Sequence, residues 1–172
     1  MAELADEFAR HHGAAFGWAL ACCRWDRSAA EDVLHTAYLR ILDGRARFGG
    51  HGEFRAFLFG VIRRTASEER RRRAVRRALS LSWLRDDSRE PSVPAVGLRS
   101  IAGEETSCEL IAALQRLSPR QREVLHLVFY QDLSIAESAA VLGIGVGSAR
   151  THYERGKAQL RALLEKDGHH AE

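Results

Sequence analysis

Apolar residues recur at three- and four-residue intervals along most of this chain, and segments that alternate as a β-strand would are nearly absent. The helical pattern fades only between about residues 78 and 106, where Pro91 and Pro94 fall among glycines, serines and acidic residues. Such a break separates two helical units. The sequence therefore predicts an all-α protein with two small helical domains, residues 1–77 and 107–172, joined by a flexible linker at 78–106.

The first domain is expected to be a helical bundle, beginning with an N-terminal helix. Ser28 followed by Glu31 has the S-x-x-E pattern of a capping box, and the helix that it starts should end at Asp43-Gly44. The glycine-rich stretch GRARFGGHG is predicted to be a loop, because helices tolerate glycine poorly. A further helix should begin near Glu53, with an apolar stripe of Phe54, Phe57, Leu58, Val61, Ile62 and Thr65.

Positive charge is concentrated in that last helix, although the net charge of the whole chain is only +3. Between Phe54 and Arg77, nine arginines stand against two acidic residues, Glu68 and Glu69, which leaves a local charge of +7. Such a segment attracts a polyanion, for example nucleic acid. A solvated, arginine-rich helix end would have the same composition, so charge alone leaves both interpretations open.

The sequence has no pattern typical of an enzyme, a metal centre or a membrane segment. It contains no run of 18 apolar residues and no secretion signal, so a cytoplasmic protein that is not inserted in a membrane is expected. Its three cysteines have no CxxC spacing, and no Walker, HExxH or nucleophile-elbow motif is present. We expect no enzymatic activity, cofactor, metal or small-molecule substrate, and surface or core positions for His11, His12, Cys22 and Cys23.

The second domain has the layout of a helix-turn-helix. After a helix over 108–117, the pattern S-P-x-Q at 118–121 predicts a capped helix that runs to about Tyr130. A short helix from Ser134 to Leu142 then precedes a glycine turn and a longer helix from about Val146.

The longer helix has one packed face and one polar face. Apolar and small residues recur at Ala149, Tyr153, Gly156, Leu160 and Leu163, which leaves the other side outward. In helix-turn-helix proteins this side enters the major groove of DNA, although a helical hairpin with a solvated polar face would show the same pattern. The outward residues are Ser148, Arg150, Thr151, His152, Glu154 and Arg155.

Three stretches in this order resemble the extracytoplasmic-function (ECF) sigma factors of bacterial RNA polymerase. SAAEDVLHTAYLRIL at 28–42 is similar to the family's DAEDLVQETFLRLW, and FRAFLFGVIRRTASEERRRR at 54–73 is similar to FRAWLFRIARNLALDYLRRRRR. LSPRQREVLHLV and LSIAESAAVLGIGVGSARTHYERGK, at 117–128 and 133–157, are similar to the family's C-terminal motifs. The resemblance covers both predicted domains.

The resemblance implies that the first domain is sigma region 2 and the second is region 4. The partners that it implies are core RNA polymerase, promoter DNA and an anti-sigma factor. Region 2 would bind the polymerase clamp through Glu31, Asp32, His35, Thr36, Leu39 and Arg40. It would open and hold the minus-ten element through Phe48, Arg55, Arg63, Arg64, Arg70 and Arg71, with Phe48 as the aromatic placed to stack a base and Phe57 and Phe59 in the core.

Region 4 would read the minus-thirty-five element as duplex DNA through the polar face of its second helix and Lys157. The chain departs from the family pattern at several positions: His35 and Thr36 replace Gln-Glu, Arg64 replaces asparagine, and Ser138 replaces isoleucine. A DNA-binding regulator of the LuxR type is the alternative, because such proteins carry a similar helix-turn-helix and a comparable LSPREREVL stretch. They lack a counterpart of the first domain.

Overall fold

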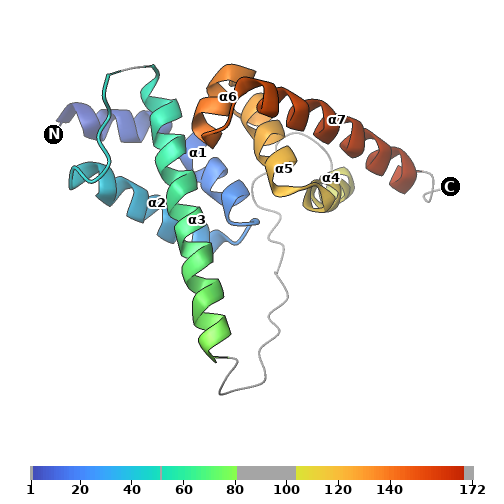
Figure 1. Ribbon diagram of the computed structural model, residues 1–172, viewed down its shortest axis with the longest axis horizontal. Helices are drawn as coiled ribbons and strands as arrows, with labels where there is room; N and C mark the ends of the chain where they lie inside the picture. The colour runs from blue at the N-terminus through green and yellow to red at the C-terminus, as the bar shows by residue number, and fades with distance from the viewer. Residues whose placement is uncertain (1, 51, 81–103, 169–172) are drawn as a thin grey trace. The chain divides into compact units, whose positions relative to one another are not determined.

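The computed structural model describes residues 2–50, 52–80 and 104–168, and every regular element in these ranges is a helix (Figure 1). The all-α prediction is confirmed. The chain divides into two compact units, Met1–Pro94 and Ala95–Glu172. The first contains α1 (Ala2–Cys22), α2 (Arg27–Leu42) and α3 (Phe54–Ser80). The second contains α4 (Glu104–Arg116), α5 (Pro119–Leu125), the π-helical turn η1 (His126–Tyr130), α6 (Ile135–Leu142) and α7 (Val146–Gly168).

Helical structure extends into the predicted linker from both sides. Helix α3 continues to Ser80, past the expected boundary at residue 77, and α4 begins at Glu104 instead of near Cys108. The remainder of the predicted linker, residues 81–103, lies outside the described residues.

The three helices of the first unit pack against one another around the apolar stripe of α3. Trp18 of α1 and Phe59 of α3 are fully buried, and the Trp18 indole N–H donates a hydrogen bond to the Phe59 carbonyl oxygen at 3.0 Å. The stripe is confirmed in its second half and is half-buried at its start, where Phe54 and Phe57 lie. Its fully packed members are Leu58, Val61, Ile62 and Thr65.

The predicted start of α2 is wrong. Asp26, and not Ser28, is the N-cap: its carboxylate accepts a hydrogen bond from the Ala29 backbone N–H at 3.0 Å. Glu31, the expected partner of Ser28, instead pairs with Arg27 at 2.9 Å. The end of the helix is as predicted, with Asp43 as the C-cap and the left-handed Gly44 after it.

The helix-turn-helix prediction is confirmed in the second unit. Ser118 and Ser134 each form a capping box, and Gly143 ends α6 in the left-handed conformation at φ 62°. The helix expected to run to Tyr130 is α-helical only to Leu125 and then widens into η1. The predicted packed face of α7 is buried at Ala149 and Gly156 and half-buried at Tyr153, Leu160 and Leu163.

Gly156 is the point of closest approach between α7 and α5. A Cβ atom added there would lie 3.0 Å from the Gln121 Cβ and 3.2 Å from the Leu125 Cδ1, which is tighter than ordinary van der Waals contact. Because two helix backbones meet at this position, a side chain of any size would push them apart.

We expect Gly156→Ala to lower the free energy of unfolding of the second unit by about 1–3 kcal/mol, as overpacking does. Hydrogen exchange of the α5 and α7 amides would measure this change locally. Gly147→Ala is the matched control, since a Cβ at Gly147 of the same helix meets nothing within 4 Å. It should leave stability unchanged or raise it by up to about 1 kcal/mol. Equal effects of the two substitutions would contradict the close approach.

His126 begins the π-helical turn and is held as a neutral ring. Its Nε2 lies 3.3 Å from the Gln131 Nε2, and its ring stacks on Tyr130 with centroids 5.3 Å apart. Burial lowers the pKa of His126 from 6.5 to about 4. The unfolded chain, by contrast, takes up this proton near pH 6.5.

The second unit should therefore lose stability as the pH falls from about 6.5 toward 4, because only the unfolded state binds the proton in this range. Between pH 7 and pH 5 we expect a loss of about 1–2 kcal/mol from this group. Urea unfolding of the wild type and of His126→Gln at both pH values measures the contribution of His126. Glutamine does not titrate, and the other histidines contribute equally to both proteins, so their effect disappears from the difference. The same pH dependence in both proteins would show that His126 is not the source of the loss of stability.

Candidate nucleic-acid and protein interfaces

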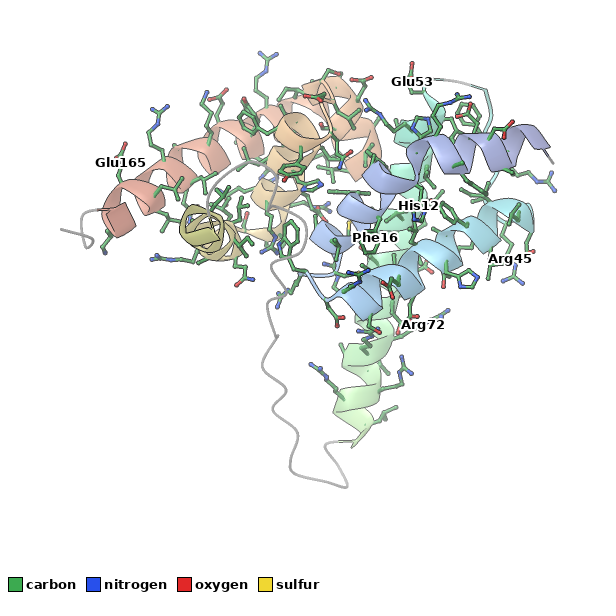
Figure 2. The ribbon with its side chains drawn as sticks, turned by 180° about the vertical axis from the view of Figure 1, so that it is seen from behind. His12, Phe16, Arg45, Glu53, Arg72 and Glu165 are labelled. Atoms are coloured by element: carbon green, nitrogen blue, oxygen red, sulfur yellow. The ribbon has the colours of Figure 1, made fainter. Side chains whose placement is uncertain are left out.

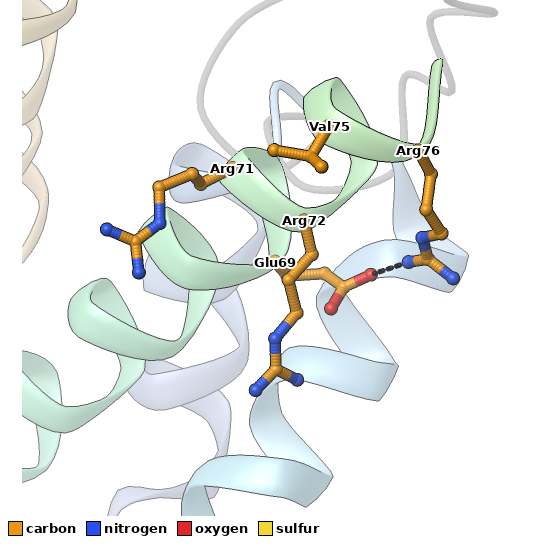
Figure 3. Close-up of a pocket in the computed structure, with 5 residues that line it drawn as sticks. All are labelled: Glu69, Arg71, Arg72, Val75 and Arg76. Atoms are coloured by element: carbon orange, nitrogen blue, oxygen red, sulfur yellow. Dashed lines mark hydrogen bonds and ion pairs between the residues drawn. The ribbon is translucent and has the colours of Figure 1, made fainter. Parts of the chain in front are cut away.

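The C-terminal half of α3 extends beyond the ends of α1 and α2 (Figure 1). It carries most of the arginines of this helix. Glu69 forms ion pairs with Arg73 at 3.2 Å and with Arg76 at 3.0 Å. Arg71 and Arg72 lie beside this pair and line an open groove with Val75, and Figure 3 shows the Arg71 guanidinium extending away from the Glu69–Arg76 pair. The basic helix is thus partly neutralised along one side.

The arginines expected at the minus-ten element fall into two neighbouring rows on α3. Arg64 and Arg71 are seven residues apart, on one face of the helix, and both are exposed. Arg63 and Arg70 have the same spacing on the adjacent face, and Arg70 also donates to the Cys22 carbonyl oxygen at 3.4 Å. Arg55, near the start of the helix, is half-buried.

Phe48 lies in the glycine loop and rests against α3. Its ring is 5.7 Å from that of Phe54 and 5.3 Å from that of Phe57, and 38% of the residue remains exposed. Phe59 is completely buried, as predicted, whereas Phe57 is half-buried and supports Phe48. The loop therefore presents a partly open aromatic surface at the N-terminal end of the helix that carries the arginine rows, which is the type of surface on which an unstacked base can lie.

Five of the six residues expected at the polymerase clamp form an exposed face on α2: Glu31, Asp32, His35, Thr36 and Leu39. Leu39 is the apolar member, with 46% of its surface exposed. A single exposed apolar side chain is common on protein surfaces, so the exposure of Leu39 is compatible with a contact but does not identify one.

Arg40, the sixth, instead points from α2 toward α3. Its guanidinium forms an ion pair with Glu68 at 2.6 Å and donates to the Thr65 hydroxyl oxygen at 3.2 Å. The hydrogen bond from Arg40 lowers the pKa of the Glu68 carboxyl. Arg40 therefore joins the two helices beneath the α2 face.

A polar cavity of about 190 Å³ lies between α2 and α3, next to this ion pair. Asp32 and Thr36 of the α2 face line it, together with Arg72, which is labelled in Figure 2. The exposed α2 face and the basic helix α3 thus both border this cavity. Sequence reasoning missed this connection, because it treated Glu68 and Glu69 only as charges within the arginine run.

The polar face of α7 is arranged as the helical pattern predicts. Ser148, Arg150, Thr151, Glu154 and Arg155 are exposed, and His152 is half-buried. The Thr151 hydroxyl donates a hydrogen bond to the Gly147 carbonyl oxygen at 3.0 Å. The helix therefore offers cations, an acid and small polar groups on one side, a combination suited to base edges and phosphates.

Lys157 is exposed but lies over an aromatic ring of its own helix. Its ammonium is 5.6 Å from the centroid of Tyr153, and Phe129 stacks on the same ring at 5.7 Å. Phe129 is 59% exposed, although the sequence placed it in an ordinary amphipathic helix. Phe129 lies within the π-helical turn η1, which the sequence did not predict.

The histidines of α1 and the two cysteines at its C-terminal end occupy structural positions, on the surface or in the core. Cys22 is buried, and burial raises the pKa of the Cys23 thiol to about 11, so this thiol stays protonated at neutral pH. His11 lies 3.3 Å from a Glu7 carboxylate oxygen, and the His12 Nδ1 lies 3.2 Å from the Tyr38 hydroxyl. Within the described ranges no cluster of three histidines, cysteines or acids could hold a metal ion.

The described part of the chain contains no helix that is long and apolar enough to cross a membrane.

Comparison with known proteins relates each unit to a different part of one family. The model of sigma-70 region 2 matches residues 8–76, and the model of sigma-70 region 4 matches residues 109–160. Similar curated proteins include the ECF RNA polymerase sigma factor SigX of Bacillus subtilis, 28% identical over 143 residues, which are 81% of this chain and 73% of SigX. The RNA polymerase sigma factor CarQ of Myxococcus xanthus is 29% identical over 159 residues, which are 92% of this chain and 87% of CarQ.

Two solved structures share the fold along nearly the whole chain. The sigma factor RpoE of Bartonella quintana, solved with the anti-sigma factor NepR, has a TM-score of 0.77 at 19% identity and covers 96% of this chain and 98% of its own. CnrH, solved with the cytosolic domain of CnrY, has a TM-score of 0.63 at 25% identity, with coverages of 95% and 88%. The LuxR-type alternative is not favoured, because the first unit matches sigma region 2. The chain belongs to the sigma-70 family and is an ECF sigma factor, with region 2 in its first unit and region 4 in its second.

Proposed function

We propose that this protein binds bacterial core RNA polymerase, directs it to a set of promoters and is controlled by an anti-sigma factor. The observation that carries the proposal is the presence on one chain of a region 2 bundle with an exposed α2 face and a region 4 helix-turn-helix. The chain acts by binding and has no catalytic step of its own. Its place of action is the cytoplasm, where polymerase and chromosome meet.

In this proposal each surface has a separate partner. The α2 face, which includes Leu39 as its apolar residue, binds the polymerase clamp. Phe48 and the arginine rows of α3 hold the separated strands of the minus-ten element, since exposed bases need a stacking surface and phosphates need cations. The polar face of α7 enters the major groove at the minus-thirty-five element, where Arg150 and Arg155 donate to guanine or phosphate and Glu154 accepts from a cytosine amino group.

The proposed control by an anti-sigma factor is based on similarity to solved structures. RpoE of Bartonella quintana was solved with the anti-sigma factor NepR, and CnrH with the cytosolic domain of CnrY. A protein of this kind that covered both the α2 face and α7 would block polymerase and promoter together. Affinity capture from the native host, with the full chain as bait, should retrieve such a partner.

The direct test adds the purified protein to bacterial core polymerase and measures transcription from the promoter of its own operon. Selective initiation that depends on the added chain is the expected result. A protein that binds this DNA alone and never gives the core promoter specificity would overturn the proposal and restore the LuxR-type alternative.

For the polymerase surface, Leu39→Ala and Arg40→Ala should behave differently. Leu39 is 46% exposed, so its truncation should leave the unfolding free energy within about 0.5 kcal/mol and weaken core binding by about tenfold. Arg40→Ala should lower the unfolding free energy by about 1 kcal/mol, since it removes the ion pair to Glu68. Urea unfolding and a binding titration with labelled core measure both. Unchanged core binding by Leu39→Ala would show that the α2 face is assigned wrongly.

For the promoter surface, Arg150→Ala combined with Arg155→Ala should reduce the affinity of the holoenzyme for promoter DNA by at least about 30-fold, at about 1–3 kcal/mol per base or phosphate contact. Binding to core should stay the same. Arg161→Ala is the matched control, because Arg161 is an exposed arginine further along the same helix. Loss of core binding in the double variant would mean that the two surfaces have been confused.

A further inference from the structure

Thr151 occupies the middle of the exposed face of α7. It lies opposite the buried residues Ala149 and Gly156, on the side of the helix that faces away from α5 and α6. It also lies in the N-terminal part of the helix, which is the part that meets base edges in helix-turn-helix proteins. Of the exposed residues on this face, Thr151 is the one with a methyl group next to a hydroxyl.

The hydroxyl proton of Thr151 is already engaged in a hydrogen bond within the helix. It donates to the Gly147 carbonyl oxygen one turn earlier, at 3.0 Å. A threonine hydroxyl has a single proton, so toward solvent the side chain offers acceptor lone pairs and the methyl group, but no donor. The hydrogen bond also holds the branched side chain in one rotamer.

The residue one turn before Thr151 on the same face is a glycine, Gly147. Helical side chains lean toward the N-terminus, so Thr151 lies over the turn that contains Gly147, where no side chain stands. A Cβ atom at Gly147 would meet nothing within 4 Å, which means that the space there is open. Gly147 therefore adds no side chain beside the Thr151 methyl.

One base pair matches this combination. Thymine carries a methyl group in the major groove, and its adenine partner presents an amino donor beside it. A G·C pair also presents an amino donor, on cytosine, but it has no methyl group, so contact with the thymine methyl is what separates the two pairs. We propose that Thr151 reads the methyl group of a thymine at one position of the upstream promoter element. This inference rests on the proposed function, because it assumes that α7 enters that groove.

The test uses the holoenzyme formed from the full chain and core polymerase. A promoter is first selected by the wild-type holoenzyme from DNA with a randomised upstream element, and each thymidine of that element is then replaced singly by deoxyuridine, which lacks only the methyl group. At one position we expect binding to fall by about 3- to 5-fold, the worth of one buried methyl contact.

Two variants identify Thr151 as the residue responsible. Thr151→Ser keeps the hydroxyl and removes the methyl group, so it should bind the dT and dU promoters equally at that position. Thr151→Val keeps a methyl group and removes the hydroxyl, so it should still prefer dT.

The possible failures are distinguishable. If the wild-type holoenzyme selects a promoter but no dU substitution affects binding, or if Thr151→Ser keeps the full preference for dT, the methyl readout is wrong and the proposed function stands. If the chain gives the polymerase no sequence selection at all, the proposed function fails, and the inference fails with it.

Discussion

The contact between Trp18 and Phe59 is the interaction on which the first unit depends. Trp18 is the largest of the fully buried side chains, and an indole N–H buried without a partner would be costly. The Phe59 carbonyl oxygen, in the N-terminal half of α3, accepts that N–H and thereby sets the position of α1 along α3. The Arg40–Glu68 ion pair then joins α2 to the same helix, so the three helices fix the position of the exposed α2 face relative to the arginine rows.

Local sequence rules predicted the helices best where a single residue decides the geometry. Ser118 was predicted correctly as a cap and Gly143 as the stop after α6, and the predicted helix start at Ser134 proved to be a second capping box. The start of α2 was not predicted correctly, because Asp26 and Ser28 are both good caps. The choice between them depends on the left-handed backbone of Arg24 and Trp25 and on burial of the Trp25 ring, which are tertiary effects.

The candidate surfaces were predictable to the extent that they follow helical periodicity. The outward face of α7 and the exposure of Leu39 follow from spacing alone. The role of Arg40 does not, because its partner Glu68 lies 28 residues away on another helix. The exposed Phe129 lies in the π-helical turn η1, which the sequence did not predict, because it indicated one continuous helix to Tyr130.

The ion pairs of Glu69 also affect how strongly binding to DNA depends on salt. An arginine that is already paired with a carboxylate in the free protein has less charge to offer a phosphate, and it displaces fewer condensed cations from the DNA. Of the nine arginines between Phe54 and Arg77, Arg73 and Arg76 are held in this way. In the proposed complex, the affinity of the basic helix for DNA should therefore fall less steeply with ionic strength than its composition suggests.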